Sequence, residues 1–320
     1  MGNIRHPRRG SMQFWPRKRS RHTLVRVRSW VKEAKVKPLG FIAYKAGMTH
    51  VQFTDMRAKS PTKGETINIP VTILECPPVV VAGVAVYKHD VYGLVKQTSI
   101  FAPKLDKMLD RRVQLPKKEA SLDAVKDFDD LRLLVQTLPA KVASVGAKKP
   151  KLFEVGIGGA KNDKLEYARK MLGKEIMVSD VFDAGNQVDI HGVSKGKGFQ
   201  GTVKRYGVPI RQHKAEKVKR GIASLGSWTP KRVEFSVAQS GKMGFHLRTE
   251  YNKKIVRVGQ NPADVNRTGG IQGYGLVHNH YVLIHGSVVG ADKREVVLTA
   301  PLRSSKYISK DVPELTYISK

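Results

Sequence analysis

Short apolar runs separated by Gly, Pro and Thr dominate the chain from Leu39 onward. Val-rich and Ile-rich runs of this length, bounded by turn residues, are typical of β-strands. We expect strands at 41–44, 67–74, 79–87, 176–178, 187–190, 234–238, 255–258, 281–284 and 295–299. No fixed-period repeat accompanies them, which argues against a solenoid or a propeller. The spacing predicts a mainly β protein built around a β-barrel.

A different pattern interrupts the strands between residues 105 and 138. Leu122, Val125, Leu131 and Leu134 stand among mixed charges, and they predict helices broken at the prolines 116 and 139. Seven acids balance seven Lys and Arg in this stretch. We therefore expect it to face solvent or protein rather than a polyanion.

One further helix is predicted over 161–174. It would begin near Asn162 or Asp163 and end at Gly173, which are residue types preferred at helix caps. We therefore expect an inserted α/β subdomain that contains helices at 105–174, within a barrel body formed by 39–104 and 175–320. The apolar residues of the helix share one side: Leu165, Ala168, Met171 and Leu172.

The first 38 residues predict a basic extension rather than a domain. The first 30 hold nine Arg and Lys and no acid, interspersed with Pro, Gly and the aromatic residues Phe14 and Trp15. Neither a helical nor a strand period is sustained. Such an arm cannot pack on itself, but it can order against nucleic acid, where Arg pairs with phosphates and aromatic faces stack on bases.

The overall charge requires a polyanionic partner. The chain has 58 Lys and Arg against 27 Asp and Glu, a net charge of +31. Unneutralised charge on this scale opposes compaction and attracts phosphate backbones. No apolar run approaches the roughly 18 to 20 residues of a membrane-spanning helix, and the basic start lacks a following apolar region, so we expect a cytoplasmic protein without a membrane partner. Cys76 is the only cysteine, which excludes disulfides within the chain and predicts a small buried residue.

The segment 192–208, GVSKGKGFQGTVKRYGV, is poor material for a core but suits a loop threaded into folded RNA. Its five glycines allow close backbone approach, its cations meet phosphates, and its rings offer stacking faces. The basic run continues to Arg220, with Glu216 as the only acid from His191 to Gly221. The alternative interpretation is an ordinary solvated charged face, which normally mixes signs.

A second alternative for this segment is a dinucleotide site, because Gly196, Gly198 and Gly201 match the G-x-G-x-x-G spacing. That motif works only when the third glycine opens a helix whose N-terminus holds the pyrophosphate. Gly207 and Pro209 interrupt any such helix within two turns. We therefore reject the nucleotide interpretation.

Trp228 follows the basic run and lies between Gly226 and Pro230. A Trp among Gly, Ser and Pro is expected at a loop tip, the alternative being a buried anchor. We thus define a basic Gly-rich loop with its tryptophan at 192–230, within the body of the chain.

An enzyme is not indicated. His278 and His280 would share one face of a strand, but no carboxylate or cysteine lies at ligand spacing to complete a metal site. The G-x-S-x-G, P-loop and H-E-x-x-H motifs are also missing from the sequence. We expect no catalytic residues, no small-molecule substrate and no cofactor, apart from magnesium ions that bound RNA could share. A free RNA-binding or RNA-modifying protein remains the alternative to a ribosomal component.

Several motifs in order resemble the family of the third protein of the large ribosomal subunit, in its archaeal and eukaryotic form. They are PRRGSMQFWPRKRSR, LGFIAYKAGMTH, CPPVVVAGVAVY, GVSKGKGFQGTVKRYGV, GSWTPKRV and GKMGFHLRTEYNKKI. The resemblance spans nearly the whole chain. It implies a translation-protein-type β-barrel with an inserted α/β region, a basic arm, and a long loop directed toward the peptidyl transferase centre.

The resemblance also implies partners and roles. The partners would be large-subunit rRNA, neighbouring ribosomal proteins and, indirectly, tRNA and elongation factors, in a structural role that includes early subunit assembly. Trp228 would lie at the tip of the family's tryptophan finger, and His213 matches a histidine that can be methylated in eukaryotic relatives. The residues expected to bind rRNA are Arg8, Arg9, Arg17, Lys18, Arg19, Arg21, Lys195, Lys197, Phe199, Gln200, Lys204, Arg205, Arg211, His213, Lys214, Lys217, Lys219, Arg220 and Trp228.

Overall fold

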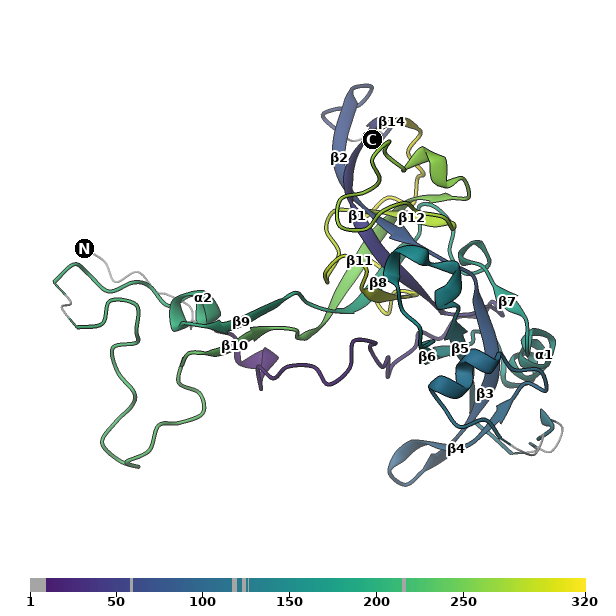
Figure 1. Ribbon diagram of the computed structural model, residues 1–320, viewed down its shortest axis with the longest axis horizontal. Coiled ribbons are helices and arrows are strands. Elements are labelled where there is room, and N and C mark those ends of the chain that lie inside the picture. Colours follow the sequence, from purple (N-terminus) through teal and green to yellow (C-terminus); the bar gives the residue numbers. More distant parts are fainter. Residues whose placement is uncertain (1–9, 58–59, 117–119, 123–124, 126, 215–216) are drawn as a thin grey trace. The chain divides into compact units, whose positions relative to one another are not determined.

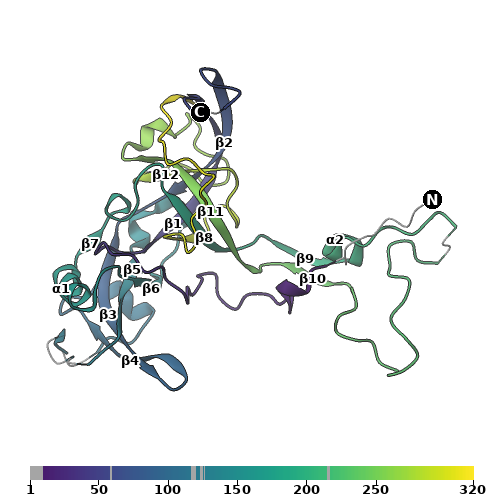
Figure 2. The same ribbon diagram turned by 180° about the vertical axis from the view of Figure 1, so that it is seen from behind.

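The computed structural model describes residues 10–57, 60–116, 120–122, 125, 127–214 and 217–320. The predicted rRNA contacts Arg8 and Arg9 lie outside these residues. The chain divides into two compact units (Figures 1 and 2). The larger unit comprises Thr23–Gly192 and Arg248–Lys320, and the smaller comprises Met1–His22 and Val193–Leu247.

A closed barrel forms one part of the larger unit. Its strands neighbour one another in the order β13-β8-β11-β12-β2-β1, and β13 pairs with β1 again, which closes the sheet. β14 extends β1 beyond the closure. The predicted mainly β fold with a barrel is confirmed. The bounds are β1 (Gly40–Thr54), β2 (Thr66–Glu75), β8 (Gln187–Val193), β11 (Leu247–Gly259), β12 (Tyr281–His285), β13 (Glu295–Thr299) and β14 (Leu315–Ile318).

A second sheet packs in the same unit, with strand order β4-β3-β5-β6 and β7 paired with β3. The predicted helix is present as α1 (Lys161–Met171), which buries Ala168 and is followed by Gly173 at φ +79°. The strands are β3 (Val79–Asp90), β4 (Gly93–Phe101), β5 (Asp130–Thr137), β6 (Leu152–Gly156) and β7 (Glu175–Ile176).

The helices expected between 105 and 138 are wrong in their main part. Among the described residues of that stretch, the longest helical segment is the 3-10 helix η2 (Lys107–Arg111), and the strand β5 follows from Asp130. Residues 131–137 are all buried, because β5 lies between β3 and β6 and is covered on both faces. A strand buried on both faces has no alternating pattern and cannot be told from a helix by its apolar spacing. The sheet also includes β3 and β4, and an inserted subdomain at 105–174 stays a prediction.

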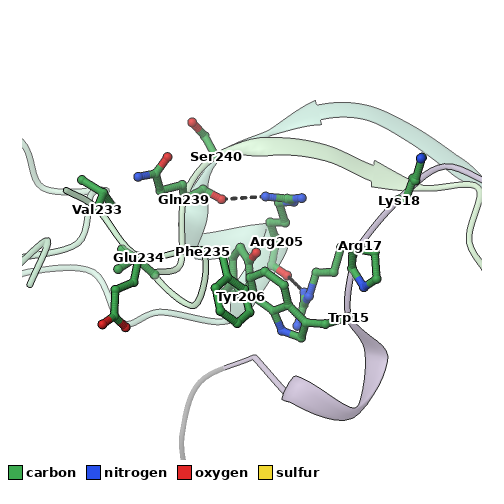
Figure 3. Close-up of a pocket in the computed structure, with 12 residues that line it drawn as sticks. Trp15, Arg17, Lys18, Arg205, Tyr206, Val233, Glu234, Phe235, Gln239 and Ser240 are labelled. Atoms are coloured by element: carbon green, nitrogen blue, oxygen red, sulfur yellow. Dashed lines mark hydrogen bonds between the residues drawn. The ribbon is translucent and has the colours of Figure 1, made fainter.

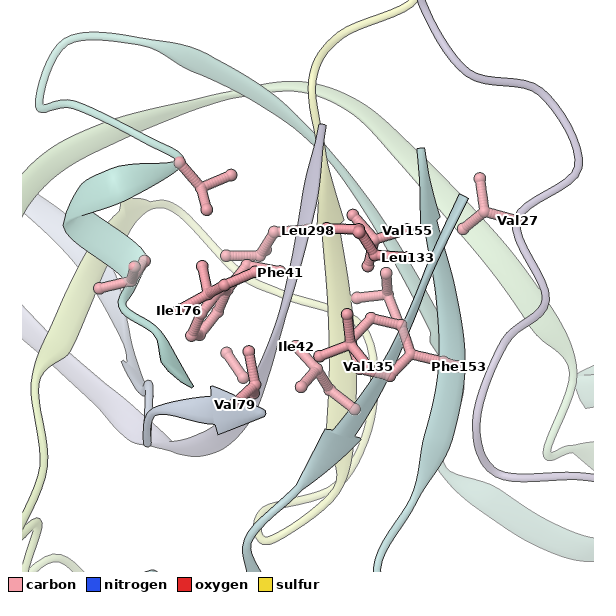
Figure 4. Packing of buried hydrophobic residues seen from close by; sticks show 14 of the residues in the cluster. Val27, Phe41, Ile42, Val79, Leu133, Val135, Phe153, Val155, Ile176 and Leu298 are labelled. Carbon is pink, nitrogen blue, oxygen red and sulfur yellow. The ribbon is translucent and has the colours of Figure 1, made fainter. Parts of the chain in front are cut away.

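The barrel and the second sheet share one hydrophobic core (Figure 4). Phe41 and Ile42 of β1 pack in one cluster with Leu133 and Val135 of β5 and with Leu298 of β13. Each is at most 1% exposed. Full burial of such a side chain contributes about 1.5–3 kcal/mol relative to exposure, so this cluster makes the larger unit one body. Cys76 belongs to the same core, as predicted, and burial raises the pKa of its thiol.

One buried carboxylate in this unit has hydrogen-bond partners for both of its oxygens. Glu75, at the end of β2, is 0% exposed. Its Oε1 accepts from the main-chain N–H groups of His278 (2.9 Å) and Asn279 (3.0 Å) and from Asn279 Nδ2 (2.8 Å). Its Oε2 accepts from the Tyr274 hydroxyl. The carboxylate thereby fastens the 274–279 loop to the barrel.

The smaller unit has little regular structure. β9 (Gly196–Gln200) pairs antiparallel with β10 (Gly241–Gly244), and the short helix α2 (Thr202–Tyr206) follows β9. The strand predicted at 234–238 is wrong, since this segment forms a turn in which Val237 N donates to Glu234 O and Phe235 is 75% exposed. Further 3-10 helices among the described residues include η1 (Met12–Phe14), η4 (Pro139–Lys141), η5 (Ala143–Val145), η6 (Val178–Asp180) and η7 (Pro262–Asp264).

Candidate nucleic-acid interface

The basic arm and the Gly-rich loop form one folded unit. Ser20 N donates to Phe245 O (2.8 Å), and His246 Nδ1 lies 3.0 Å from Lys18 O. The Arg19 guanidinium carbon lies 4.8 Å from the centre of the Phe245 ring. In both ribbon views the purple arm runs beside β10 (Figures 1 and 2). The sequence predicts that the arm cannot pack on itself, and its described residues instead pack on the loop, which supplies a surface for them within the chain.

An aromatic and guanidinium cluster, made of Trp15, Arg17, Arg205, Tyr206 and Phe235, stabilises this unit (Figure 3). The Trp15 ring centre lies 6.1 Å from that of Tyr206 and 5.8 Å, edge to face, from that of Phe235. Arg17 and Arg205 lie over the Tyr206 ring at 4.1 and 5.2 Å. Tyr206 is only 7% exposed, so it is the centre of the cluster.

Three of the predicted rRNA-binding arginines also donate side-chain hydrogen bonds to main-chain carbonyl oxygens of the same unit. Arg17 donates to Arg205 O, and Arg205 donates to Gln239 O (2.9 Å) and Lys242 O (3.2 Å). Arg211 donates to Ile222 O. Carbonyl oxygens satisfy these donors without neutralising the charge, so the guanidinium groups keep their attraction for phosphate. Their contacts with RNA stay a prediction.

Glycine is required where the loop turns most sharply. Gly244, beside β9, has φ +80°, and a Cβ there would lie 2.1 Å from Lys195 O. Gly198 on β9 has φ +63°, and Gly207 ends α2 at φ +72°. These positions favour a residue without a side chain. The glycines thus shape a narrow backbone hairpin, as expected for a segment that approaches another surface closely.

The remaining predicted rRNA contacts lie on the surface of the smaller unit. Phe199 is 72% exposed, while Gln200 is half-buried and donates through Nε2 to Lys197 O at 2.6 Å. The sequence segments of this unit contain 19 of the 58 Lys and Arg but two of the 27 acids. The exposed cations and His213 share this surface: Lys18, Arg19, Arg21, Lys195, Lys197, Lys204, His213, Lys214, Lys217, Lys219 and Arg220.

Trp228 lies in an exposed turn, in agreement with the loop-tip prediction. Its side chain is 84% exposed, and its carbonyl accepts from Lys231 N at 2.9 Å. The interpretation of Trp228 as a buried anchor is wrong. An exposed indole on a basic loop offers a stacking face or a polar N–H to a partner.

The structure gives no support to the alternative sites. Gly196 and Gly198 lie on β9 and α2 has five residues, so the dinucleotide motif lacks its strand-turn-helix context. Across the described residues, no group of three His, Cys, Asp or Glu could hold a metal ion. No helix in the described part of the chain is long and apolar enough to cross a membrane.

Comparison with known proteins identifies the family. The family model for ribosomal protein L3 matches residues 1–319. The chain belongs to the ribosomal protein L3 family. Its relatives include the large ribosomal subunit protein uL3 of Methanocaldococcus jannaschii, 44% identical over 99% of this chain and 97% of the relative. The uL3 protein of Methanobrevibacter smithii is 44% identical over 99% of this chain and 98% of the relative. The uL3 protein of Archaeoglobus fulgidus is 43% identical over 94% of this chain and 93% of the relative.

Membership in the ribosomal protein L3 family confirms the resemblance drawn from the motifs, and it agrees with the expectation of a structural ribosomal protein rather than an enzyme. The sequence did not reveal the residues that assemble the unit. Tyr206, Phe235, Phe245 and His246 join the arm to the loop, and their segments are more than 180 residues away from it in sequence. No local pattern encodes such a pairing.

Proposed function

We propose that this protein is a structural constituent of the large ribosomal subunit and binds large-subunit rRNA through its smaller unit, near the peptidyl transferase centre. The observation that carries the proposal is the nearly single-signed charge of that unit, on glycine-rich backbone with exposed rings. Phosphates bind such cations, whereas unstacked bases bind aromatic faces. The names of the archaeal relatives, each a large ribosomal subunit protein, support the choice of subunit.

In this proposal the larger unit is a rigid anchor, and the smaller unit orders the RNA that surrounds it. Early incorporation follows, because a folded basic unit neutralises and organises RNA before later components bind. Neighbouring ribosomal proteins would contact the locally neutral stretch 105–138, where Asp127 is already paired with Lys88. Trp228, at the tip, would influence tRNA and elongation factors indirectly, without supplying an acid or a base.

The first test compares a double variant, Lys195→Ala with Lys197→Ala, with a matched control, Lys148→Ala with Lys149→Ala. All four lysines are exposed, but the control pair lies in the larger unit. We expect the first variant to weaken binding to large-subunit rRNA and to flatten its salt dependence by about 1.4–1.8 in log-log slope, for two lost phosphate contacts. Equal salt slopes for the two variants would contradict this assignment of the interface.

A second test separates a ribosomal component from a free RNA-binding or RNA-modifying protein. The protein should sediment with large subunits at moderate salt, because surrounding RNA retains it. A free contact of six to ten phosphates instead loses roughly 10³–10⁵ in affinity between 50 and 200 mM salt. Recovery mainly from the post-ribosomal supernatant would refute the proposal.

The role of Trp228 has its own test. Trp228→Ala should leave unfolding and subunit incorporation unchanged, because the side chain is 84% exposed. It should alter tRNA binding or factor-dependent steps on ribosomes carrying the variant, measured beside Tyr307→Ala, which removes a 99% exposed ring from the larger unit. Loss of incorporation with Trp228→Ala alone would assign the ring to assembly instead.

A further inference from the structure

The smaller unit contains a hollow of about 510 Å³, bounded by three segments (Figure 3). Its walls come from residues 15–18 of the arm, from Arg205 and Tyr206 at the end of α2, and from the turn at 233–240. The volume falls within the roughly 300–1,000 Å³ typical of sites for small organic groups. The sequence interpretation assigned no role to Phe235, Gln239 or Ser240, which line it.

We propose that this hollow receives a single unstacked nucleobase of the bound RNA. The inference rests on the proposed function, since the base would belong to the RNA that the smaller unit binds. Phe235 is 75% exposed although it borders the hollow, and it contacts Trp15 only edge to face. Because most of the Phe235 ring is exposed, a planar group can stack on it, and Trp15 lines the same hollow. Bases splayed out of folded RNA stack on such aromatic faces.

The charge of the hollow favours a nucleotide over an apolar peptide side chain. Arg17, Lys18 and Arg205 line it, with Glu234 as the single acid. In the described part of the chain neither Arg17 nor Arg205 has a carboxylate within ion-pair distance, and both guanidinium groups donate to main-chain carbonyl oxygens. A phosphate next to the inserted base would meet these guanidinium groups.

Polar groups at the rim can bind the edge of a base. Gln239 uses its main-chain carbonyl for Arg205, so its side-chain amide can both donate and accept. Glu234 Oε2 accepts from the hydroxyl of Ser236 at 3.1 Å, and its other oxygen can accept from an amino group of a base. An aromatic wall, a cationic rim and amide and carboxylate groups together match the chemistry of a base attached to its phosphate.

The test replaces the ring with a smaller apolar side chain, using Phe235→Leu, with Phe235→Tyr as the variant that keeps the ring. Tyr307→Ala serves as the control for an exposed ring in the larger unit. We expect Phe235→Leu to weaken binding of the full-length protein to large-subunit rRNA about 5- to 150-fold, the range for one lost base stack. Phe235→Tyr and Tyr307→Ala should bind like the parent. The salt slope should stay unchanged, because no phosphate contact is lost.

Ultraviolet crosslinking of the same complexes, followed by mass spectrometry, supplies the second readout. The parent and Phe235→Tyr should yield a nucleotide adduct on the 233–240 segment or on Trp15, and Phe235→Leu should lose it. Parent-like affinity and an unchanged adduct in Phe235→Leu would overturn the inference while leaving the proposed function intact. Failure of the parent protein to bind rRNA would instead overturn the proposed function.

Discussion

Replacement of Glu75 tests how far one buried carboxylate fastens the barrel. Glu75→Ala removes the acceptor for four hydrogen bonds, from Tyr274, His278 and Asn279. An unsatisfied buried donor costs about 1–3 kcal/mol. Water can replace the carboxylate only at the exposed side of the loop, around His278. We therefore expect the free energy of unfolding to fall by about 3–5 kcal/mol, as when one partner of a buried charged network is removed.

Two milder variants separate the contributions of the two Glu75 carboxylate oxygens to the free energy of unfolding. Glu75→Gln keeps one oxygen for the three donors on Oε1 and places an amide against the Tyr274 hydroxyl, which can accept, so we expect a loss of about 1–2 kcal/mol. Tyr274→Phe removes one hydrogen bond to a charged group and should cost about 1.5–3 kcal/mol. Glu65→Ala, at an exposed acid near the other end of β2, is the control and should stay within about 0.5 kcal/mol of the parent.

The assay is urea unfolding of the full-length chain at high salt, followed by tryptophan fluorescence. Trp15→Phe and Trp228→Phe leave Trp30, which packs against the shared core, as the reporter of the larger unit. Linear extrapolation gives the free energy in water. If Glu75→Ala unfolded within about 1 kcal/mol of the parent, or if Glu75→Gln were equally damaging, the proposed hydrogen-bond account would be refuted.

Two further predictions concern the barrel. Burial lowers the pKa of His191, whose ring nitrogens lie 3.0 and 3.1 Å from threonine hydroxyls. The unfolded chain therefore binds the proton of this imidazole more readily than the folded chain does, and the free energy of unfolding should fall as the pH drops below about 6.5. His191→Gln should reduce the difference between the urea midpoints measured at about pH 7 and pH 5. Gly259→Ala should cost about 1–3 kcal/mol in the same unfolding assay, because its Cβ would lie 2.1 Å from Tyr281, whereas Gly269→Ala meets no atom and should be neutral.

The sequence predicted those strands whose apolar runs stand out from their surroundings. β2, β3, β12 and β13 are recognised because Val-rich and Ile-rich runs are bounded by turn residues. β5 is missed because both of its faces are buried, and β4 because four consecutive residues in its middle are exposed, three of them polar. Periodicity reports burial on one face only, so it misses β4 and cannot tell β5 from a helix, whereas the buried strand β13 is recognised by the turn residues that bound it.

The chemistry of the interface was more predictable than its architecture. The cations and glycines of the 192–220 segment are visible in the sequence, and the exposure of Trp228 follows from its turn-forming neighbours. The packing of Trp15 on Tyr206 and Phe235 depends on a contact between distant segments. Single-sequence composition predicts the kind of partner, but such tertiary contacts decide which rings remain available to it.

The closed barrel has a consequence for the protein before it reaches RNA. Open sheet edges recruit other chains, which endangers a newly made protein that waits for its partner. Pairing of β13 with β1 removes those edges from the barrel. In the second sheet, Pro38, which has no N–H to offer, bridges Ile157 just beyond β6, and exposed Lys96 lies on the outer strand β4. The fold therefore limits self-association of the free protein, independently of its positive charge.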